Sequence, residues 1–191
     1  GIDDKFKVLK SIDIKNVDEL NRKLKNKKNI KELSNDTSIK TDYLTILRRY
    51  VNSFHPPPRK IGDFPSLSHL TVDKLEKMGI TTTPQLYDKL VTKELRNNLK
   101  TELGVADEEI LILTKLADVS RLKYVSPIYA TLIVYSDYDT VQKIRNADYN
   151  DLHNQLVKIN KEKNLYKGRI NLKDIKYLVN ETDYVTLDVE Y

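Results

Sequence analysis

The acidic residues between positions 118 and 139 come closest to a cluster that could catalyse a reaction. Asp118, Asp137 and Asp139 are carboxylates, which serve as general acids and bases when a fold holds them beside a substrate. No nucleophile–base pair accompanies them, and turn and capping roles explain aspartates at these positions. The other acids are scattered at the density of a charged surface. We therefore predict that the protein is not an enzyme.

Metal and cofactor chemistry lacks the residues it needs. The sequence has no cysteine, which excludes disulfides, thiolate nucleophiles and cysteine-based zinc sites. The three histidines, His55, His69 and His153, are far apart and form no pair at ligand spacing. None of the five glycines lies in a GxGxxG or GxxxxGK[ST] loop of the kind that cradles phosphates. We expect no cofactor, no metal site and no small-molecule substrate.

The charge of the chain is unevenly distributed. The net charge is +5, and residues 1–60 carry 15 basic and 8 acidic groups, whereas the last eleven residues carry four acids and no base. A basic end attracts polyanions such as nucleic acid. A chain rich in lysine, asparagine and isoleucine also solvates its surface with lysine, which explains the same charge without a dedicated binding face.

Tyrosine is the second unusual feature, with twelve in the chain. Five of them fall in or beside predicted helices, and we expect these five to pack in the core: Tyr129, Tyr135, Tyr138, Tyr149 and Tyr177. The alternative role is a stacking platform for a single-stranded nucleic acid.

The segment Leu75–Leu90 shows how the chain must be built to position these groups. An apolar helical face ends at Gly79, a residue that closes a helix in the left-handed conformation without steric cost. Thr82 or Thr83 can cap a second helix, with Pro84 at its first position, where a missing N–H costs nothing. This order of stop, turn, cap and restart predicts a hairpin of two helices.

The same pattern recurs twice. Sixty-six residues earlier, Asp13 takes the place of Gly79, since aspartate enters left-handed conformations more readily than most residues, and Asn16 takes the place of the capping threonine. Fifty-eight residues after the central hairpin, residues 133–144 repeat it again. Three copies at a period near sixty residues predict an all-α repeat protein, in which each unit buries its apolar face on its neighbours.

The repeats and the punctuation between them divide the chain into five parts. Three consecutive prolines at 56–58 enforce an extended segment, which we expect to be a rigid spacer, with a proline-rich ligand as the alternative. The predicted parts are a divergent first helical-hairpin unit at 1–51, a Pro-rich linker at 52–63, a second unit at 64–117, a third unit at 118–181 and an acidic tail at 182–191. Within the first unit, residues 25–29 are expected as a basic loop or frayed helix end, followed by a short helix at 30–35. The tail is expected to be a lone extended arm.

The sequence carries no membrane or export signal. No apolar run approaches the roughly 18 residues that a membrane span needs. No signal peptide is visible, so we expect a cytoplasmic protein, although a Gly1 left by trimming would leave an exported parent open.

One stretch carries a resemblance to a known family. Residues 117–130 (ADVSRLKYVSPIYA) resemble the A-D-L-x-R-I-x-G-V-G-x-x-Y-A stretch of an uncharacterised bacterial and archaeal domain family, and residues 139–160 resemble the continuation of that stretch. The resemblance covers residues 62–180 well and residues 1–60 as a more divergent copy. It implies a fold of tandem helix-hairpin-helix-like repeats of the SAM-like type and implies no activity.

The resemblance also points to candidate nucleic-acid contacts. Helix-hairpin-helix modules bind DNA phosphates through backbone N–H groups of a Gly-hydrophobic-Gly turn before a helix, since successive free amides bind anions. The matching turns here are residues 66–68 and 124–126. Both have lost the two glycines, which hinders the close approach of a phosphate, and their serines also suit helix caps. The candidate contacts are Ser66, Leu67, Ser68, Arg121, Lys123, Tyr124, Val125 and Ser126. A pair between Asp118 and Arg121 would explain that arginine without phosphate.

Two hypotheses for function follow. The favoured one is a non-catalytic interaction module that presents a helical-repeat surface to a protein partner. The alternative is a sequence-independent DNA- or RNA-binding protein that contacts the nucleic-acid backbone through these turns and the basic first unit. The first predicts an exposed apolar patch, and the second predicts basic side chains and free helix N-termini on one face.

Overall fold

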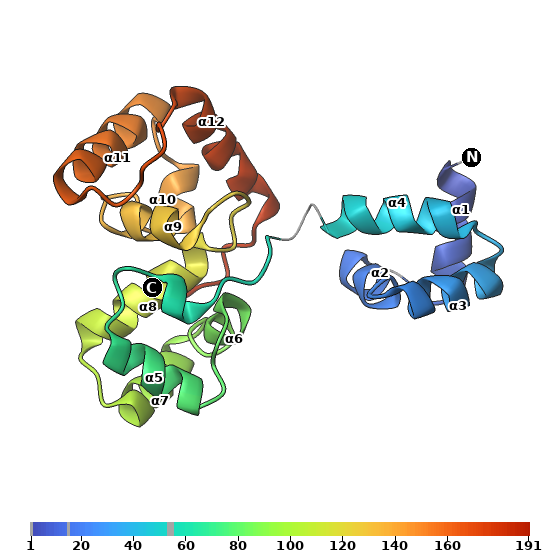
Figure 1. Cartoon of the computed structure of the whole chain (residues 1–191), viewed down its shortest axis with the longest axis horizontal. Coiled ribbons are helices and arrows are strands. Elements are labelled where there is room, and N and C mark those ends of the chain that lie inside the picture. The colour runs from blue at the N-terminus through green and yellow to red at the C-terminus, as the bar shows by residue number, and fades with distance from the viewer. Residues whose placement is uncertain (1, 15, 53–55) are drawn as a thin grey trace. The chain divides into compact units, whose positions relative to one another are not determined.

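The chain is helical throughout the part that the structure describes, residues 2–14, 16–52 and 56–191 of a computed structural model (Figure 1). No strand occurs within these ranges, and the one β-bridge joins Lys60 to Thr82. The predicted all-α class is therefore confirmed. The helices lie in two compact units, residues 1–55 and 56–191. In the described ranges, no helix combines the length and hydrophobicity needed to cross a membrane.

Four helices form the first unit: α1 (Ile2–Ser11), α2 (Val17–Lys23), α3 (Lys27–Thr37) and α4 (Thr41–Asn52). Leucine and isoleucine from all four build its core. Asn16 caps α2 as expected, accepting a hydrogen bond from the backbone N–H of Glu19 at 2.9 Å. The segment 25–29 was expected as a basic loop or a frayed helix end, but its residues 27–29 belong to α3, because Asn26 accepts the N–H of Asn29 at 2.9 Å and so starts the helix three residues before the expected position 30.

The turn predicted at Gly79 has the expected left-handed backbone. Its φ is +79°, and the φ of Asp13 at the corresponding place in the first unit is +66°. In each turn the residue that follows, Ile80 or Ile14, donates its N–H to the carbonyl five residues back at 2.9 or 3.1 Å. This is the bond that closes a helix end after a left-handed residue. Asp13 therefore replaces glycine in this backbone role, as the sequence suggested.

Eight helices and two 3₁₀ turns form the second unit. They are η1 (Ile61–Asp63), α5 (His69–Lys77), α6 (Thr83–Tyr87), α7 (Lys93–Leu103), α8 (Asp107–Val119), α9 (Pro127–Val134), α10 (Val141–Arg145), α11 (Tyr149–Lys163), α12 (Leu172–Glu181) and η2 (Thr182–Tyr184). Helix α11 is followed by Asn164, whose left-handed φ of +51° ends the helix.

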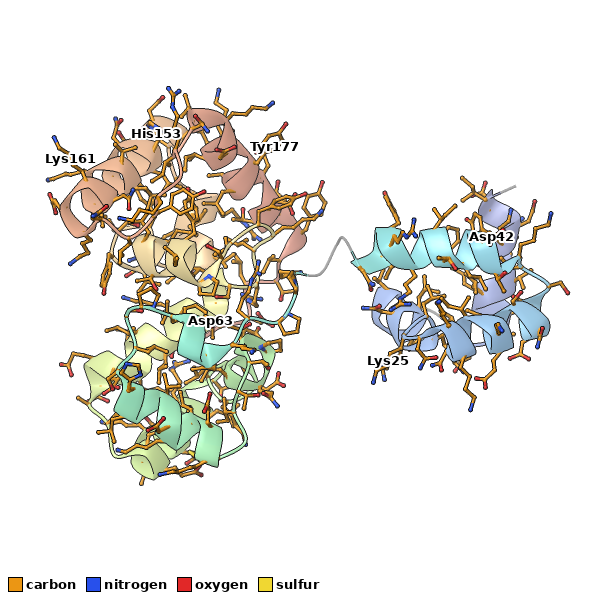
Figure 2. The ribbon with its side chains drawn as sticks, viewed as in Figure 1. Lys25, Asp42, Asp63, His153, Lys161 and Tyr177 are labelled. Atoms are coloured by element: carbon orange, nitrogen blue, oxygen red, sulfur yellow. The ribbon has the colours of Figure 1, made fainter. Side chains whose placement is uncertain are left out.

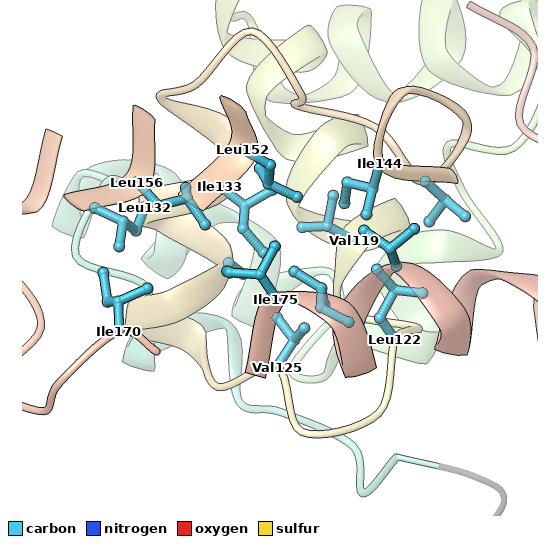
Figure 3. Close-up of a cluster of buried hydrophobic side chains, with 14 of the residues drawn as sticks. Val119, Leu122, Val125, Leu132, Ile133, Ile144, Leu152, Leu156, Ile170 and Ile175 are labelled. Carbon is cyan, nitrogen blue, oxygen red and sulfur yellow. The ribbon is translucent and has the colours of Figure 1, made fainter. Parts of the chain in front are cut away.

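Helix α8 joins two hydrophobic cores. Its Leu113 and Ala117 pack with residues of α5–α7, whereas its Leu116 and Val119 pack with residues of α9–α12. Figure 3 shows Val119 beside Leu122 and Ile144 in the second of these cores. The boundary expected at 117/118 thus lies inside one continuous helix, and helix packing on both sides makes residues 56–191 a single compact unit.

The expected linker is divided between the units. Its residues 53–55 lie outside the described part of the chain, and the division between the units falls after residue 55. The following residues are tied to the second unit, because the N–H of Ile61 donates to Thr81 and the N–H of Thr83 donates to Arg59, at 3.0 and 2.9 Å. Ile61 is fully buried.

The acidic tail is not a lone arm. Residues 182–184 form η2, and one Arg145 guanidinium nitrogen donates to the carbonyls of Thr182 and Val185. The chain then runs back to α8, beside which Figure 1 marks the C-terminal end.

Candidate functional site

A groove of about 850 Å³ opens between α9, α12 and the two loops at 123–126 and 166–170. Four tyrosines from separate segments line it: Tyr124, Tyr129, Tyr166 and Tyr177. Four predicted contact residues, Lys123, Tyr124, Val125 and Ser126, therefore lie together at this groove.

The loop at 123–126 is shaped by one left-handed residue between two buried ones. Tyr124 has a φ of +66° and a side chain that is 77% exposed. Leu122 and Val125 on either side are almost fully buried in the core. Ser126 then caps α9 by accepting the N–H of Tyr129 at 3.2 Å. The conformation turns the Tyr124 ring outward while its neighbours anchor the loop.

Tyr129 and Tyr166 form the floor of the groove. Their ring centres are 5.4 Å apart and the planes meet at 70°, an edge-to-face pair. The side chain of Asn160 fixes the backbone of Tyr166 on both sides, since it donates to the Tyr166 carbonyl and accepts the Tyr166 N–H, each at 2.8 Å. The backbone of Tyr166 is therefore held in place by the fold itself.

Burial keeps the Tyr129 hydroxyl neutral. Desolvation raises its pKa well above the ordinary range, and the neighbouring Tyr166 and the Asp174 carboxylate raise it further. The hydroxyl can therefore donate or accept a hydrogen bond at any physiological pH.

Tyr177 is on the outer side of α12 (Figure 2). Its side chain is 54% exposed, because Ile175 and Leu178 take the buried face of that helix. Tyr135 is likewise 42% exposed, so the expectation that both pack in the core is wrong. The other three tyrosines of that set, Tyr129, Tyr138 and Tyr149, do pack against the core.

The charged residues of the groove are of both signs. Lys123 and Arg169 supply cations, and Asp174 and Glu181 supply carboxylates. The Lys123 ammonium lies 5.5 Å from the centre of the Tyr124 ring, in cation–π range. The groove is therefore aromatic with balanced charge, and it does not present a cationic track.

The predicted phosphate-binding turns do not present a row of free amides. Pro127 has no N–H, and Ser126 takes the N–H of Tyr129. In the other turn, Ser68 caps α5 by accepting the N–H of Thr71 at 3.1 Å. Both serines therefore have the capping role.

The other predicted contacts lie away from the groove. The Ser66 hydroxyl is hydrogen-bonded to that of Thr131 at 3.2 Å, and Leu67 packs against both cores. Arg121 faces Asp118 at 2.5 Å, the pair anticipated from their spacing, and also Asp188 at 3.1 Å. The structure thus separates Arg121 from Lys123, which are only two residues apart in the chain.

The three acids singled out from the sequence have structural partners. Asp139 lies between Lys115 and Lys143, at 2.5 and 2.7 Å. Asp137 and Gln155 form two hydrogen bonds, at 3.1 and 3.0 Å. In the described ranges, no group of three or more His, Asp or Glu side chains is arranged to hold a metal ion.

The first unit has a basic hollow of about 550 Å³. Asn21, Arg22, Lys25, Arg48 and Asn52 line it, from α2, the turn after it and the end of α4. Lys25 lies on the surface of this unit in Figure 2. The basic run at 25–29 was the only part of this hollow that the sequence indicated. That α4 contributes Arg48 and Asn52 to it becomes clear only from the fold.

The fold and the groove define an all-α domain with a groove lined by four tyrosines. Residues 65–185 match the family described as "Domain of unknown function (DUF4332)", and the chain belongs to that family. The resemblance to an uncharacterised domain family is thereby confirmed. No curated protein and no solved structure matches the chain.

Proposed function

We propose that the protein is a non-catalytic interaction module whose tyrosine groove binds a segment of a protein partner. The observation that carries the proposal is the combination of two exposed rings, Tyr124 and Tyr177, with a rigid floor made by Tyr129 and Tyr166. Tyrosine supplies a large contact area at a small cost in side-chain entropy, and it is enriched among residues that dominate protein interfaces.

The charges favour a polypeptide over a polyanion. A nucleic-acid backbone in this groove would meet the carboxylates of Asp174 and Glu181 as well as the cations of Lys123 and Arg169. A peptide with side chains of both signs can pair with all four, and such complementarity selects partners and suppresses wrong ones.

Panning a random-peptide display library against the full chain tests this proposal. We expect enriched peptides that bind the purified protein and lose at least ~10-fold in affinity on Tyr177→Ala, as for an aromatic hot spot. Tyr184→Ala is the matched control, since Tyr184 is 79% exposed and does not line the groove. Failure to enrich any peptide, or equal loss with both variants, would refute a groove-specific role.

The second candidate is sequence-independent binding of DNA or RNA by the first unit. The observation in its favour is the basic hollow, where Arg22, Lys25 and Arg48 converge. Binding of a labelled mixed-sequence duplex and single strand should weaken steeply with salt, and Arg22→Gln with Arg48→Gln should reduce the salt slope by about 2. Arg49→Gln on the exposed side of α4 is the control. Absence of binding even at low salt would eliminate this candidate.

We also propose that the three hairpins are tandem helix-hairpin-helix-like units. The shared left-handed turn at Asp13 and Gly79 supports the relation between the first two. In the third, Thr140 still caps α10, whereas Asp137 does not adopt the left-handed conformation. The third hairpin would then be the most altered copy.

A further inference from the structure

The last six residues, Thr186–Tyr191 (TLDVEY), lie in a site of their own, which we call the tail site. It is formed by Tyr87, Val91, Lys93, Asp118 and Arg121. Polar contacts reach it from four tail residues: Thr186, Asp188, Glu190 and Tyr191. The first three are spaced two residues apart, which is typical of an extended peptide held along one edge, and Tyr191 follows directly after Glu190.

The deepest contact is made by the Tyr191 hydroxyl, which donates to Asp118 at 2.8 Å. Asp118 is 1% exposed, and the same carboxylate accepts the N–H of Val141 at 2.9 Å and pairs with Arg121 at 2.5 Å. A carboxylate buried to this degree must have its lone pairs satisfied. The tail thus completes a polar centre whose other members belong to the domain.

The second contact is a preorganised arginine. The Arg121 guanidinium lies 4.7 Å from the centre of the Tyr87 ring and is held by Asp118, so that another of its nitrogens points to Asp188 at 3.1 Å. Arginine fixed by stacking and by a first carboxylate loses little freedom when it binds a second one.

The third contact is made by the backbone near the start of α7. The N–H of Glu190 donates to the Val91 carbonyl at 3.0 Å, and the N–H of Lys93 donates to the Glu190 carboxylate at 3.1 Å. Together the three contacts involve an acidic residue, Asp188, a second acidic residue two positions later, Glu190, and a tyrosine directly after it, Tyr191.

The tail is separable from the domain that holds it. The family match ends at residue 185, where Arg145 anchors the chain, whereas the tail-site residues all lie inside the match. The tail itself is shallow, since Leu187 is 46% exposed and Tyr191 is 53% exposed. The residues that contact the tail therefore all belong to the matched domain, whereas the tail lies beyond the match and near the surface.

We infer that the tail site is a recognition site for an extended acidic segment of a partner protein with the pattern Asp-x-Glu-Tyr, which the chain's own tail occupies in cis. A tethered tail has an effective concentration of about a millimolar, so an identical tail from a second copy cannot outcompete it. A partner segment that makes further contacts, for example across the exposed Leu187 position, can displace the tethered tail. This site is distinct from the tyrosine groove, and the inference stands without the proposed function.

The test uses a labelled peptide, TLDVEY, and the full chain carrying Asp188→Ala with Tyr191→Ala, which releases the tail. We expect the peptide to bind this variant at least ~10-fold more tightly than it binds the wild type, because the tethered competitor has been removed. Substitution of Asp by Asn or of Tyr by Phe in the peptide should each weaken binding several-fold, and these changes leave the protein itself intact. Tyr177→Ala in the groove should leave binding unchanged.

The contrary outcomes are distinct. A folded tail-released variant that does not bind the peptide, or equal affinity for wild type and variant, would overturn the site. Wild-type dimers that dissociate on Tyr191→Ala would assign the site to exchange between copies and overturn the partner. If no library peptide binds the full chain while TLDVEY binds the tail-released variant as expected, the proposed function is refuted and the tail site is not.

Discussion

Substitution of Asp118 by asparagine tests whether the polar centre around α8 stabilises the second unit. The Asp118 side chain is 2% exposed and that of its partner Arg121 is 18% exposed, so the variant leaves a mostly buried arginine without its nearest anion. Breaking a buried pair from one side costs about 3–5 kcal/mol, and the lower end applies here because Arg121 retains Asp188.

The expected loss is therefore about 3 kcal/mol in the free energy of unfolding of the second unit. At about 4 °C per kcal/mol for a domain of this size, its Tm should fall by about 12 °C. Because typical domains have a stability of about 5–15 kcal/mol, the variant should still fold at 25 °C.

Hydrogen exchange followed by mass spectrometry is the suitable assay, since it separates the two units of one chain. Exchange in α8 and α10 should rise, while α1–α4 serve as the internal reference. Asp137→Asn is the matched control, because the Asp137 side chain is exposed and accepts a surface hydrogen bond from Gln155, so this variant should change stability by less than about 0.5 kcal/mol. A loss below about 1 kcal/mol for Asp118→Asn would refute the assignment of a stabilising buried pair.

Four further predictions concern stability. Leu116→Ala should lower the free energy of unfolding, measured by urea denaturation, by about 2–5 kcal/mol. Leu111 lies on the same helix and is 40% exposed, so Leu111→Ala should lower it by well under 1 kcal/mol. Gly79→Ala should cost about 1–2 kcal/mol in the same assay through left-handed strain alone, since a Cβ there meets no atom within 4 Å. Burial and then Asp118 raise the pKa of Tyr191 above its ordinary value of 10.0. The contribution of Tyr191 to stability is therefore complete below pH 10.0 and is lost as the pH rises further. Tyr191→Phe should remove this alkaline dependence from stability measured between pH 8 and 11. Burial alone would raise the pKa of Asp188, but Tyr87, the backbone and Arg121 lower it below the ordinary value of 3.8. The contribution of Asp188 to stability is therefore present above pH 3.8 and is lost in stronger acid. An Asp188→Asn variant whose stability had the same acid profile as the wild type would contradict this.

The helix ends were predictable because their signals are local. Asn16, Thr92 and Thr140 each cap the helix they precede, and Gly104 ends α7 with a φ of +62°. Each such signal depends on a side chain within three residues of the backbone group it satisfies, so one sequence is enough to see it.

Exposure within a helix was less predictable. Tyr177 lies on a strongly amphipathic helix, yet a tyrosine satisfies both environments, since its ring is apolar and its hydroxyl is polar. Only the packing of α12 against α11, with Ile175 inward, decides that Tyr177 faces outward and lines the groove. The groove itself joins segments about fifty residues apart, and no periodicity in the chain records such a meeting.

The contrast between Arg121 and Lys123 shows how far local spacing can carry a functional argument. Spacing suggested both that Arg121 pairs with Asp118 and that it contacts phosphate with Lys123. The fold supports the first alternative and places Asp188, 67 residues away, on the remaining side of the guanidinium. A phosphate at Arg121 would have to displace two carboxylates, those of Asp118 and Asp188. Around Arg121, the place that a phosphate would take is therefore occupied by two carboxylates of the chain itself.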